Sequence, residues 1–402
     1  MPSTPAVRRE QINFQVALIT PLIHVKGYAA PETKAAAERA HVLIKQAEGF
    51  GEPPEDPLLL FSVLYALWIA SFVAFNGDVV RELAEQFRAL AEKQGTTAPL
   101  LIAHRVMGIS LLHTGDIAEG RAHYDQSIAL YDPAAHLPLA TRFSVEARVS
   151  TLSFRAWALW FLGYPEAALV DADHALKYAR EIGQAATLMV ALHYMSFTHI
   201  HCGNYGAAKA EADELVALAD EKTTLIWKAL GMLDQGCLLV LKGKASGAVQ
   251  TFTSGMISYQ STGSTVWIPL HLSYLAKAYS ELGQVDDAVR CIGEAITAVE
   301  TTRERWCEAE INRIVGEIAL MSPGPGAAKA EAYFERALTI ARQQRAKSWE
   351  LRAAMSIARL WHDQGKREEA RDLLVPVYGW FTEGFDTRDL KEAKALLEEL
   401  AA

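Results

Sequence analysis

Small and large apolar residues recur at fixed distances from a series of glycines in the middle of the chain. Four of these glycines stand forty residues apart, at Gly163, Gly203, Gly243 and Gly283. Five residues after each comes an alanine, and seven residues before each comes another small residue. Large apolar or aromatic residues are frequent four positions before and nine positions after the glycine. A period of this length predicts stacked antiparallel helix pairs with the glycine in the turn.

The same slots occur around Gly115 and Gly365, and around a Pro/Gly-rich turn at Ser322–Gly326. Small residues on both helices let the backbones approach closely, and large residues one turn away fill the groove beside them. This pattern resembles the tetratricopeptide repeat, which has a small residue and an aromatic in its first helix, then Ala and Phe in its second. The resemblance spans Ile102 to Val377, with about forty residues per repeat instead of thirty-four, which we interpret as longer helices.

The pattern therefore predicts an all-α, tetratricopeptide-like, right-handed superhelical solenoid of about nine helical hairpins, with no sheet and with a C-terminal capping helix. We expect a single solenoid over residues 1–402, made of divergent N-terminal hairpins, regular repeats and a cap, at 1–96, 97–378 and 386–402. Further turns are expected near Gly27–Pro31 and Asn76–Asp78, and the longest linkers at Gly49–Pro57 and Asp132–Pro138. Asp386 or Thr387 is expected to cap the last helix.

The segment from Leu58 to Phe75 has eighteen residues without a charge, which is the lower limit for crossing a bilayer. It also occupies a regular slot in the repeat, which favours an inner helix of the solenoid and predicts no membrane partner. Met1 to Glu10 shows no secretory signal. The four scattered cysteines form no C-x-x-C pair and are typical of a reducing, cytoplasmic setting.

The charge pattern excludes one class of partner. The formal net charge is -9, and no Lys/Arg cluster longer than a few residues occurs. A protein that binds nucleic acid through its phosphates normally carries a basic face. We therefore predict that nucleic acid is not a direct partner.

Three stretches support a more specific resemblance. They are Ala129–His136, with the sequence ALYDPAAH; Leu162–Leu169, with the sequence LGYPEAAL; and the run from Ala346 through Leu390. These resemble the C-terminal repeat region of bacterial multidomain signalling proteins, which carry a class III adenylate/guanylate cyclase domain, then a P-loop ATPase, then such an array. The resemblance implies a sensor or scaffold region. This chain has no G-x-x-x-x-G-K-[ST] loop, so the enzymatic activity of that family is not carried over, and no cofactor is expected.

Two groups of residues invite a functional interpretation that the sequence does not favour. His199, His201 and Cys202 resemble a metal cluster, but residues two apart on a helix point in different directions, so packed histidines and no metal are expected. Trp227, Trp267 and Trp349 each stand sixteen residues before a turn glycine. We interpret this series, with Trp306 close to its register, as a structural stripe that packs each first helix against the next repeat.

The inner groove is the remaining candidate site. In tetratricopeptide arrays, positions thirteen, ten, six and three before the turn glycine face the concave side, and here they gather aromatic, His and cationic residues. We expect Trp157 and Phe197 to be neighbours in one row on an open face, with Lys277 further along it. An apolar stretch ending in a cation suits a ligand with an apolar body and an acidic end. The predicted partner contacts are Trp157, Trp160, His193, Phe197, His201 and Lys277.

The resulting hypothesis is a non-catalytic binding array, the sensor or scaffold region of a signalling ATPase or nucleotide cyclase. Its partner would be a protein or peptide segment, a small ligand, or the linked ATPase or cyclase domain. One alternative is a structural homo-oligomerisation module. Another is a metal-dependent hydrolase that uses the groove histidines, although no Ser/His/Asp set or carboxylate pair occurs at a useful spacing.

Overall fold

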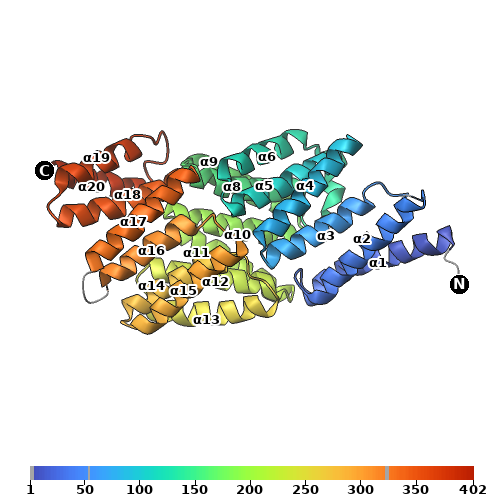
Figure 1. Cartoon of the computed structure of the whole chain (residues 1–402), viewed down its shortest axis with the longest axis horizontal. Coiled ribbons are helices and arrows are strands. Elements are labelled where there is room, and N and C mark those ends of the chain that lie inside the picture. Colours follow the sequence, from blue (N-terminus) through green and yellow to red (C-terminus); the bar gives the residue numbers. More distant parts are fainter. Residues whose placement is uncertain (1–3, 53–54, 322–325) are drawn as a thin grey trace.

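Helices and loops make up all of the chain that the structure describes, and the predicted all-α fold is confirmed. The structure is a computed structural model that describes residues 4–52, 55–321 and 326–402. Nine antiparallel helix pairs and a last single helix follow one another in these ranges. The pairs stack into a solenoid whose two termini lie at opposite ends of its long axis (Figure 1).

The first helices of the pairs are α1 (Pro5–Lys26), α3 (Leu59–Val73), α5 (Thr97–Thr114), α8 (Ala147–Phe161), α10 (Ala185–Cys202), α12 (Leu225–Leu241), α14 (Ile268–Glu281), α16 (Glu308–Met321) and α18 (Lys347–Asp363). The second helices are α2 (Pro31–Gly49), α4 (Gly77–Gln94), α6 (Ile117–Leu130), α9 (Pro165–Ile182), α11 (Tyr205–Glu221), α13 (Ala245–Ser261), α15 (Val285–Thr302), α17 (Gly326–Gln343) and α19 (Arg367–Tyr378). The capping helix is α20 (Arg388–Ala401), and a short insertion holds α7 (Pro133–His136) and the 3₁₀ helix η1 (Leu137–Thr141).

The small-residue slots lie where the two helices of a pair cross. A side-chain carbon added at Gly108 would come within 2.5 Å of the Tyr124 ring, and one added at Gly316 within 2.4 Å of the Phe334 ring. Both rings are buried. The helices can approach this closely because one of them carries no side chain at the crossing, as the sequence pattern predicted.

A second series of backbone positions ends the second helices. Gly183, Thr223, Gly263, Arg303 and Arg345 all have positive φ, and each lies just after the end of a second helix. Left-handed residues are common at helix C-termini, where glycine usually fills the position. Three of these positions carry residues other than glycine, so the ends of the second helices are not marked by a regular glycine spacing in the sequence.

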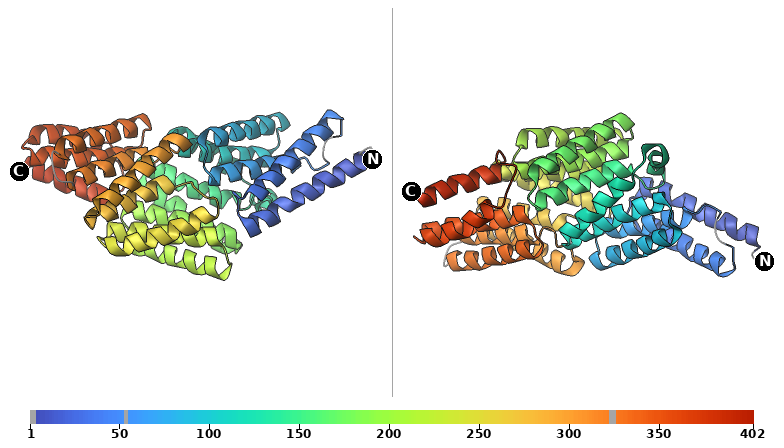
Figure 2. Two further views of the ribbon diagram at one scale, coloured as in Figure 1. Left: turned by 60° about the horizontal axis from the view of Figure 1, so that its bottom comes forward. Right: turned by 90° about the horizontal axis from the view of Figure 1, so that it is seen from above.

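The solenoid winds tightly enough for its second turn to rest on its first. The backbone N–H groups of Thr265 and Val266 donate to the carbonyl of Val73, at 2.8 and 3.1 Å. The N–H of Arg305 donates in the same way to the carbonyl of His113, at 2.9 Å. Figure 2 shows the orange and red C-terminal helices beside teal and green ones, and α18 contacts α8 directly. The interior is therefore closed by packed elements over much of its length.

The extra residues between Gly115 and Gly163 form the insertion that contains α7 and η1. It begins with Asp132, whose carboxylate accepts the N–H of Ala134 as a local cap. The chain then returns to the solenoid through Ser144, which has a φ of 67°. The predicted linker at Asp132–Pro138 therefore contains the short helix α7 and the start of η1.

The expected inner helix in Leu58–Phe75 is present, and the expected capping bond of the last helix is not. The segment Leu58–Phe75 contains the inner helix α3, and none of the described helices is long and apolar enough to span a membrane. Thr387 is the N-cap of α20, but its hydroxyl donates to the carbonyl of Gly384 and accepts nothing from the helix. Parts of three sequence predictions lie outside the described residues: the N-terminal residues 1–3, residues 53–54 of the first linker, and residues 322–325 of the Pro/Gly-rich turn.

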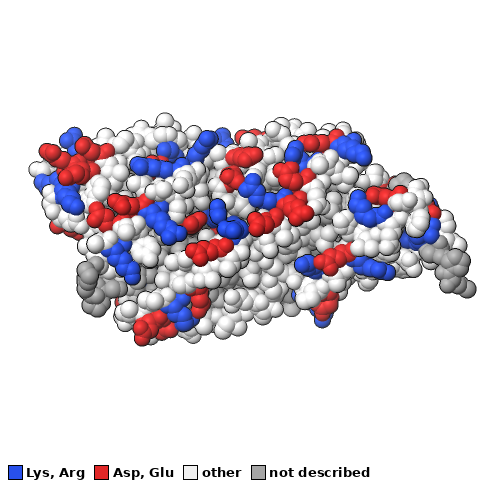
Figure 3. Space-filling model, viewed as in Figure 1, with Lys and Arg blue, Asp and Glu red and all other residues white. Residues whose placement is uncertain are grey.

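Charged side chains of both signs alternate over the face in Figure 3, without an extended basic patch on that face. Many of them pair within a helix at i, i+3 or i, i+4, as Arg88 does with Glu85 and Glu92. Such exposed pairs contribute little to stability. On this face, the mixture of both charge signs agrees with the lack of long Lys/Arg clusters in the sequence.

Replacing Ala288 by Phe tests the placement of the hairpin interface. Ala288 is fully buried where α15 packs on α14, so the larger ring should destabilise the fold by about 1–3 kcal/mol through overpacking. Urea unfolding measures the change. Val289→Phe is the matched control, because Val289 is 58% exposed. Equal unfolding midpoints for the two variants would contradict the placement.

Candidate functional site

The residues predicted to line an open groove are instead buried in an aromatic cluster at the centre of the solenoid. Trp157 and Phe197 are neighbours, as the repeat spacing predicted, with ring centroids 3.8 Å apart. Their exposed fractions, however, are only 1% and 4%. Trp160, His193 and His201 are buried as well. The prediction that these five side chains lie on an accessible face is therefore wrong.

The physical reason is that the second superhelical turn fills the interior of the first. Trp306 packs against Trp157 with ring centroids 5.6 Å apart, and Trp349 packs against Trp160 at 4.8 Å. The Ser348 hydroxyl donates to the carbonyl of Trp160, 188 residues earlier in the chain. The tryptophan stripe is thus structural, but Trp267, Trp306 and Trp349 pack mainly on rings one superhelical turn away and not only in the next repeat.

Lys277 lies apart from this cluster, in a charged groove of about 170 Å³ in the C-terminal half. Its ammonium group is 2.8 Å from Glu317, which also pairs with Arg313. Burial opposes ionisation of Glu317, but Arg313 and Lys277 lower its pKa to about 2. Arg352 pairs with Asp389 at 2.7 Å in the same groove. These charges largely neutralise one another, so Lys277 is not a free cation.

The histidines at the end of α10 do not form a metal site. His201 stacks on Phe197 at 3.9 Å, and burial lowers its pKa well below the ordinary value. His199 turns the other way and contacts the side-chain amide of Asn204. Within the described ranges, no group of three or more His, Cys, Asp or Glu side chains is arranged to hold a metal ion.

A buried polar joint connects the two turns beside the aromatic cluster. The Trp267 indole N–H donates to Nε2 of His113 at 3.1 Å. Oε1 of Glu304 accepts the Trp267 backbone N–H and the Trp306 indole N–H, each at 2.8 Å. Burial lowers the pKa of His113 to about 3 and raises that of Glu304 to about 7, although the two donors oppose the second shift. The joint therefore contains a neutral imidazole and a carboxyl group that titrates near neutrality.

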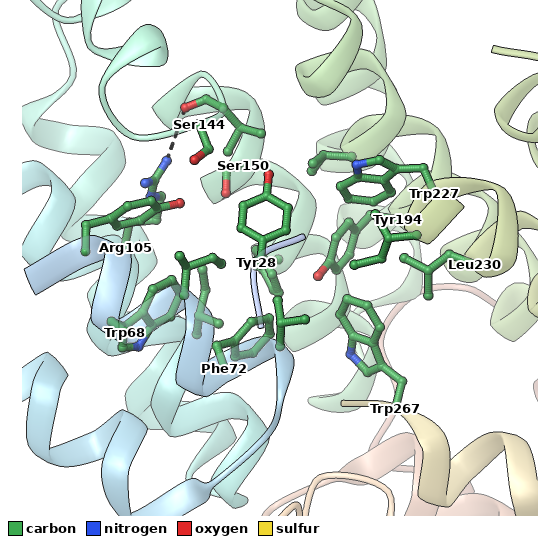
Figure 4. A pocket seen from close by; sticks show the side chains of 18 of the residues that line it. Tyr28, Trp68, Phe72, Arg105, Ser144, Ser150, Tyr194, Trp227, Leu230 and Trp267 are labelled. Atoms are coloured by element: carbon green, nitrogen blue, oxygen red, sulfur yellow. Dashed lines mark hydrogen bonds between the residues drawn. The ribbon is translucent and has the colours of Figure 1, made fainter. Parts of the chain in front are cut away.

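One cavity remains open on the inner side of the first superhelical turn. Its volume is about 70 Å³, and first helices of five pairs contribute to its wall, together with the α1–α2 turn and the segment after η1. The wall is mainly apolar and rich in aromatic rings, and Figure 4 shows several of these rings around the central Tyr28. The principal ring-bearing residues are Trp68, Phe72, Phe154, Tyr194, Trp227 and Trp267.

Arg105 is the one charged residue in this wall. It is 1% exposed, and its guanidinium carbon lies 5.2 Å from the centre of the Tyr65 ring. Nη1 donates to the carbonyl of Val145 at 3.5 Å, whereas Nη2 has no hydrogen-bond partner within the described residues. The hydroxyls of Tyr28 and Tyr65 interact with Ser144 at the same end of the cavity. The cavity thus has a polar cationic end and an apolar body.

The sequence reading did not select Arg105, although it contained a signal for it. Arg105 stands ten residues before Gly115, which is one of the positions that face the concave side. Ser144 and Val145, by contrast, belong to the insertion and occupy no repeat position. Their place in the cavity wall could not follow from a forty-residue period.

Two of the stretches that carried the family resemblance meet in the structure. A side-chain carbon at Gly163 would lie 2.5 Å from the Trp380 ring, and one at Gly384 would lie 2.2 Å from Pro165. The Glu383 carboxylate accepts the backbone N–H of Glu166 at 2.9 Å, at the start of α9. Glu166 in turn accepts the N–H of Gly384 at 2.7 Å. The α8–α9 turn and the α19–α20 loop therefore form one tight, reciprocal contact.

The comparisons with known proteins support the repeat assignment. The tetratricopeptide repeat model matches residues 101–126, 149–170 and 351–375, which lie in the α5–α6, α8–α9 and α18–α19 pairs. The fold is a tetratricopeptide-like helical solenoid. No curated protein is significantly similar to this chain in sequence.

Solved structures of similar fold extend over nearly the whole chain. A Rap protein complexed with competence and sporulation factor is 12% identical, with a TM-score of 0.62 over 98% of this chain and 99% of that one. The Rap conjugation gene regulator of plasmid pLS20, in complex with the Phr* peptide, is 11% identical, with a TM-score of 0.53 over 97% and 96%. The quorum sensor NprR from B. thuringiensis is 12% identical, with a TM-score of 0.51 over 92% and 98%. At these identities the likeness establishes the fold alone.

Removing the Trp157 ring tests whether it is structural. Because this side chain is buried in the cluster, Trp157→Ala should destabilise the fold by about 3–5 kcal/mol. Denaturant unfolding measures the loss, with Phe14→Ala as the control, because Phe14 is 71% exposed. A stability loss no larger than that of the control would restore the open-groove interpretation.

The raised pKa of Glu304 predicts how the stability of the fold depends on pH. Its pKa is about 7 in the folded chain against 4.5 for an ordinary Glu, so the folded state binds more protons between these values. Its contribution to stability should therefore fall as the pH rises from about 4.5 to 7, by about 1–3 kcal/mol, and stay constant above that. Unfolding midpoints at pH 5 and 7.5 measure this fall.

Glu304→Gln should unfold with a smaller pH dependence than the parent chain across this window. Glu300→Gln, at an exposed carboxyl group on α15, is the control and should keep the parent dependence. A Glu304→Gln variant with the full parental fall between pH 5 and 7.5 would show that this carboxyl group ionises normally.

Proposed function

We propose that this chain is a non-catalytic binding array that holds a short protein segment or a small ligand inside its first superhelical turn. The observation that carries the proposal is the aromatic cavity on the inner side of the first superhelical turn. Ligand sites are typically concave and mostly apolar, with a few polar groups that fix orientation. The cavity has this composition, with its polar groups at one end.

The solved structures support the kind of partner. Two of them are complexes, one with competence and sporulation factor and one with the Phr* peptide. Their fold likeness covers almost the whole of both chains. A peptide or a ligand of similar chemistry is therefore the partner that we propose for this array.

The buried aromatic cluster does not contact the ligand directly in this proposal, but it packs against one residue of the cavity wall. Trp267 lies in the cavity wall and also 5.2 Å from His193 and 6.2 Å from Trp157, measured between ring centroids. A ligand in the cavity would therefore contact Trp267, a side chain that also packs between the two superhelical turns. Through this route, we propose, binding alters how the turns rest on each other. A partner contact at Lys277, in the charged groove, stays a prediction.

The resemblance to signalling proteins supports a finer proposal, in which the array serves as the sensor of a linked ATPase or nucleotide cyclase. The two resembling stretches at Gly163–Glu166 and Trp380–Gly384 pack against each other, which supports a shared structural role for them. The hydrolase alternative is not supported, because the imidazole groups of His193 and His201 are buried and a substrate would not reach them.

Indole binding tests the site itself. This neutral aromatic probe should bind saturably to the chain, as measured by isothermal titration calorimetry. Ile226→Trp places a large ring at the half-exposed rim of the cavity, and should weaken indole binding by at least about tenfold. Val289→Trp, on the exposed face of α15, is the control. Absence of saturable binding, or equal affinity for both variants, would overturn the proposal.

A further inference from the structure

The charge at the polar end of the cavity narrows the ligand class, and this step rests on the proposed function. Arg105 lies in the middle of the inner helix α5 and is buried. It forms no ion pair within the described part of the chain, because no carboxylate there lies within 4.0 Å of its nitrogens. Burying a charge without a counter-ion is costly, and most buried charges in proteins are therefore paired.

The contacts that Arg105 does make satisfy only part of its donors. The Tyr65 ring offers a cation–π contact, the Tyr65 hydroxyl interacts with the guanidinium group, and the Val145 carbonyl accepts one long hydrogen bond from Nη1. Nη2 carries two N–H groups and has no partner in the described chain. A carboxylate is the group that matches the planar fork of a guanidinium, with two parallel hydrogen bonds.

The neighbours of Arg105 favour an anion over a second cation or a neutral group. The hydroxyls of Tyr28, Tyr65 and Ser144 lie at the same end and can donate as well as accept. Figure 4 shows Arg105 and Ser144 at one side of the cavity and Trp227 and Trp267 at the other. A bound molecule would therefore place its charged end among the donors and its body along the rings.

The space available limits the size of that molecule. The cavity of about 70 Å³ is smaller than the apolar cavity of about 150 Å³ that accepts benzene. A carboxylate with a slender chain fits. A wider ring, such as indole or the phenyl group of 4-phenylbutyrate, would lie towards the rim, where Ile226 and Trp227 are partly exposed. Bulky or multiply charged anions such as nucleotides do not fit this shape or this single cation.

We propose that the cavity binds a monocarboxylate with an apolar body, and that Arg105 pairs with its carboxylate. The same chemistry is offered by a free acid and by the C-terminal residue of a peptide. The aromatic wall would bind the body of either ligand, and Arg105 would select ligands that carry the negative charge.

A matched pair of ligands tests the charge selection on the unmodified chain. Calorimetry at pH 7.5 compares 4-phenylbutyrate with 4-phenylbutanol, which has the same body without the charge. The acid should bind at least about tenfold more tightly, because a hydrogen bond between ions is about twice as strong as a neutral one. Equal affinities for acid and alcohol would overturn the inference. If indole and the alcohol bind but the acid gains nothing, the proposed binding function survives and only the charge selection fails.

Variants then assign the selection to Arg105. Arg105→Gln should remove the preference for the acid over the alcohol, and Arg105→Lys should keep part of the preference. Arg148→Gln is the control, because Arg148 stacks on the Tyr178 ring at 3.9 Å and does not line the cavity. A preference that persists in Arg105→Gln would contradict the assignment. If that variant does not fold, the ligand pair and Arg105→Lys decide the question.

A pair of peptides distinguishes between the two possible sources of the carboxylate, a free acid and a peptide C-terminus. Acetyl-Ala-Ala-Phe with a free C-terminus is compared with the same peptide amidated. Tighter binding of the free peptide than of 4-phenylbutyrate would identify a peptide C-terminus as the ligand. Binding of the small acid alone would identify a free carboxylic acid, and either result supports the pairing with Arg105.

Discussion

The ends of the inner helices depend on hydrogen bonds from loops almost half the chain away. The last carbonyls of an α-helix have no partner within the helix. In this solenoid the carbonyls of Val73, His113 and Trp160 accept from Thr265, Arg305 and Ser348, one superhelical turn later. Thr265 and Arg305 lie in loops just before first helices, and Ser348 lies at the start of the first helix α18, so helix ends of one turn contact the beginnings of first helices in the next. These contacts join one superhelical turn to the next.

The same loops deliver the tryptophans to the interior. Trp267, Trp306 and Trp349 come directly after the docked segments and enter the space that an open solenoid would leave to solvent. There they pack on rings of the first turn and bury large apolar surfaces, which is the dominant source of stability in protein interiors. The concave face is consequently a core over most of its length, and binding is confined to places where this filling is incomplete.

The cavity around Arg105 is such a place. Its wall combines inner helices with two non-repeating segments, the α1–α2 turn that carries Tyr28 and the insertion that carries Ser144. Irregular segments on a rigid scaffold often carry binding residues, because they are free of the packing rules that the repeats obey. Trp267 belongs both to this wall and to the joint with His113 and Glu304, so the binding space and the contact between turns share a side chain.

The sequence by itself determined the helix pairs, their order and the rows of equivalent residues. The residues of the repeat pattern pack against the other helix of their own hairpin, as the small Gly108 and Ala288 and the large Tyr124 and Phe334 do. Because these contacts are local and recur in successive hairpins, they appear as a period in the sequence. The adjacency of Trp157 and Phe197 followed from the same period.

Only the tertiary structure decided that this row is buried. The superhelical pitch accumulates from small rotations between repeats, and a contact such as that of Ser348 with Trp160 joins residues 188 positions apart without any period. For the same reason the sequence placed the site on the open groove residues and missed the cavity. Arg105 stood at an inward position, but its lack of a counter-ion depends on which side chains the fold brings around it.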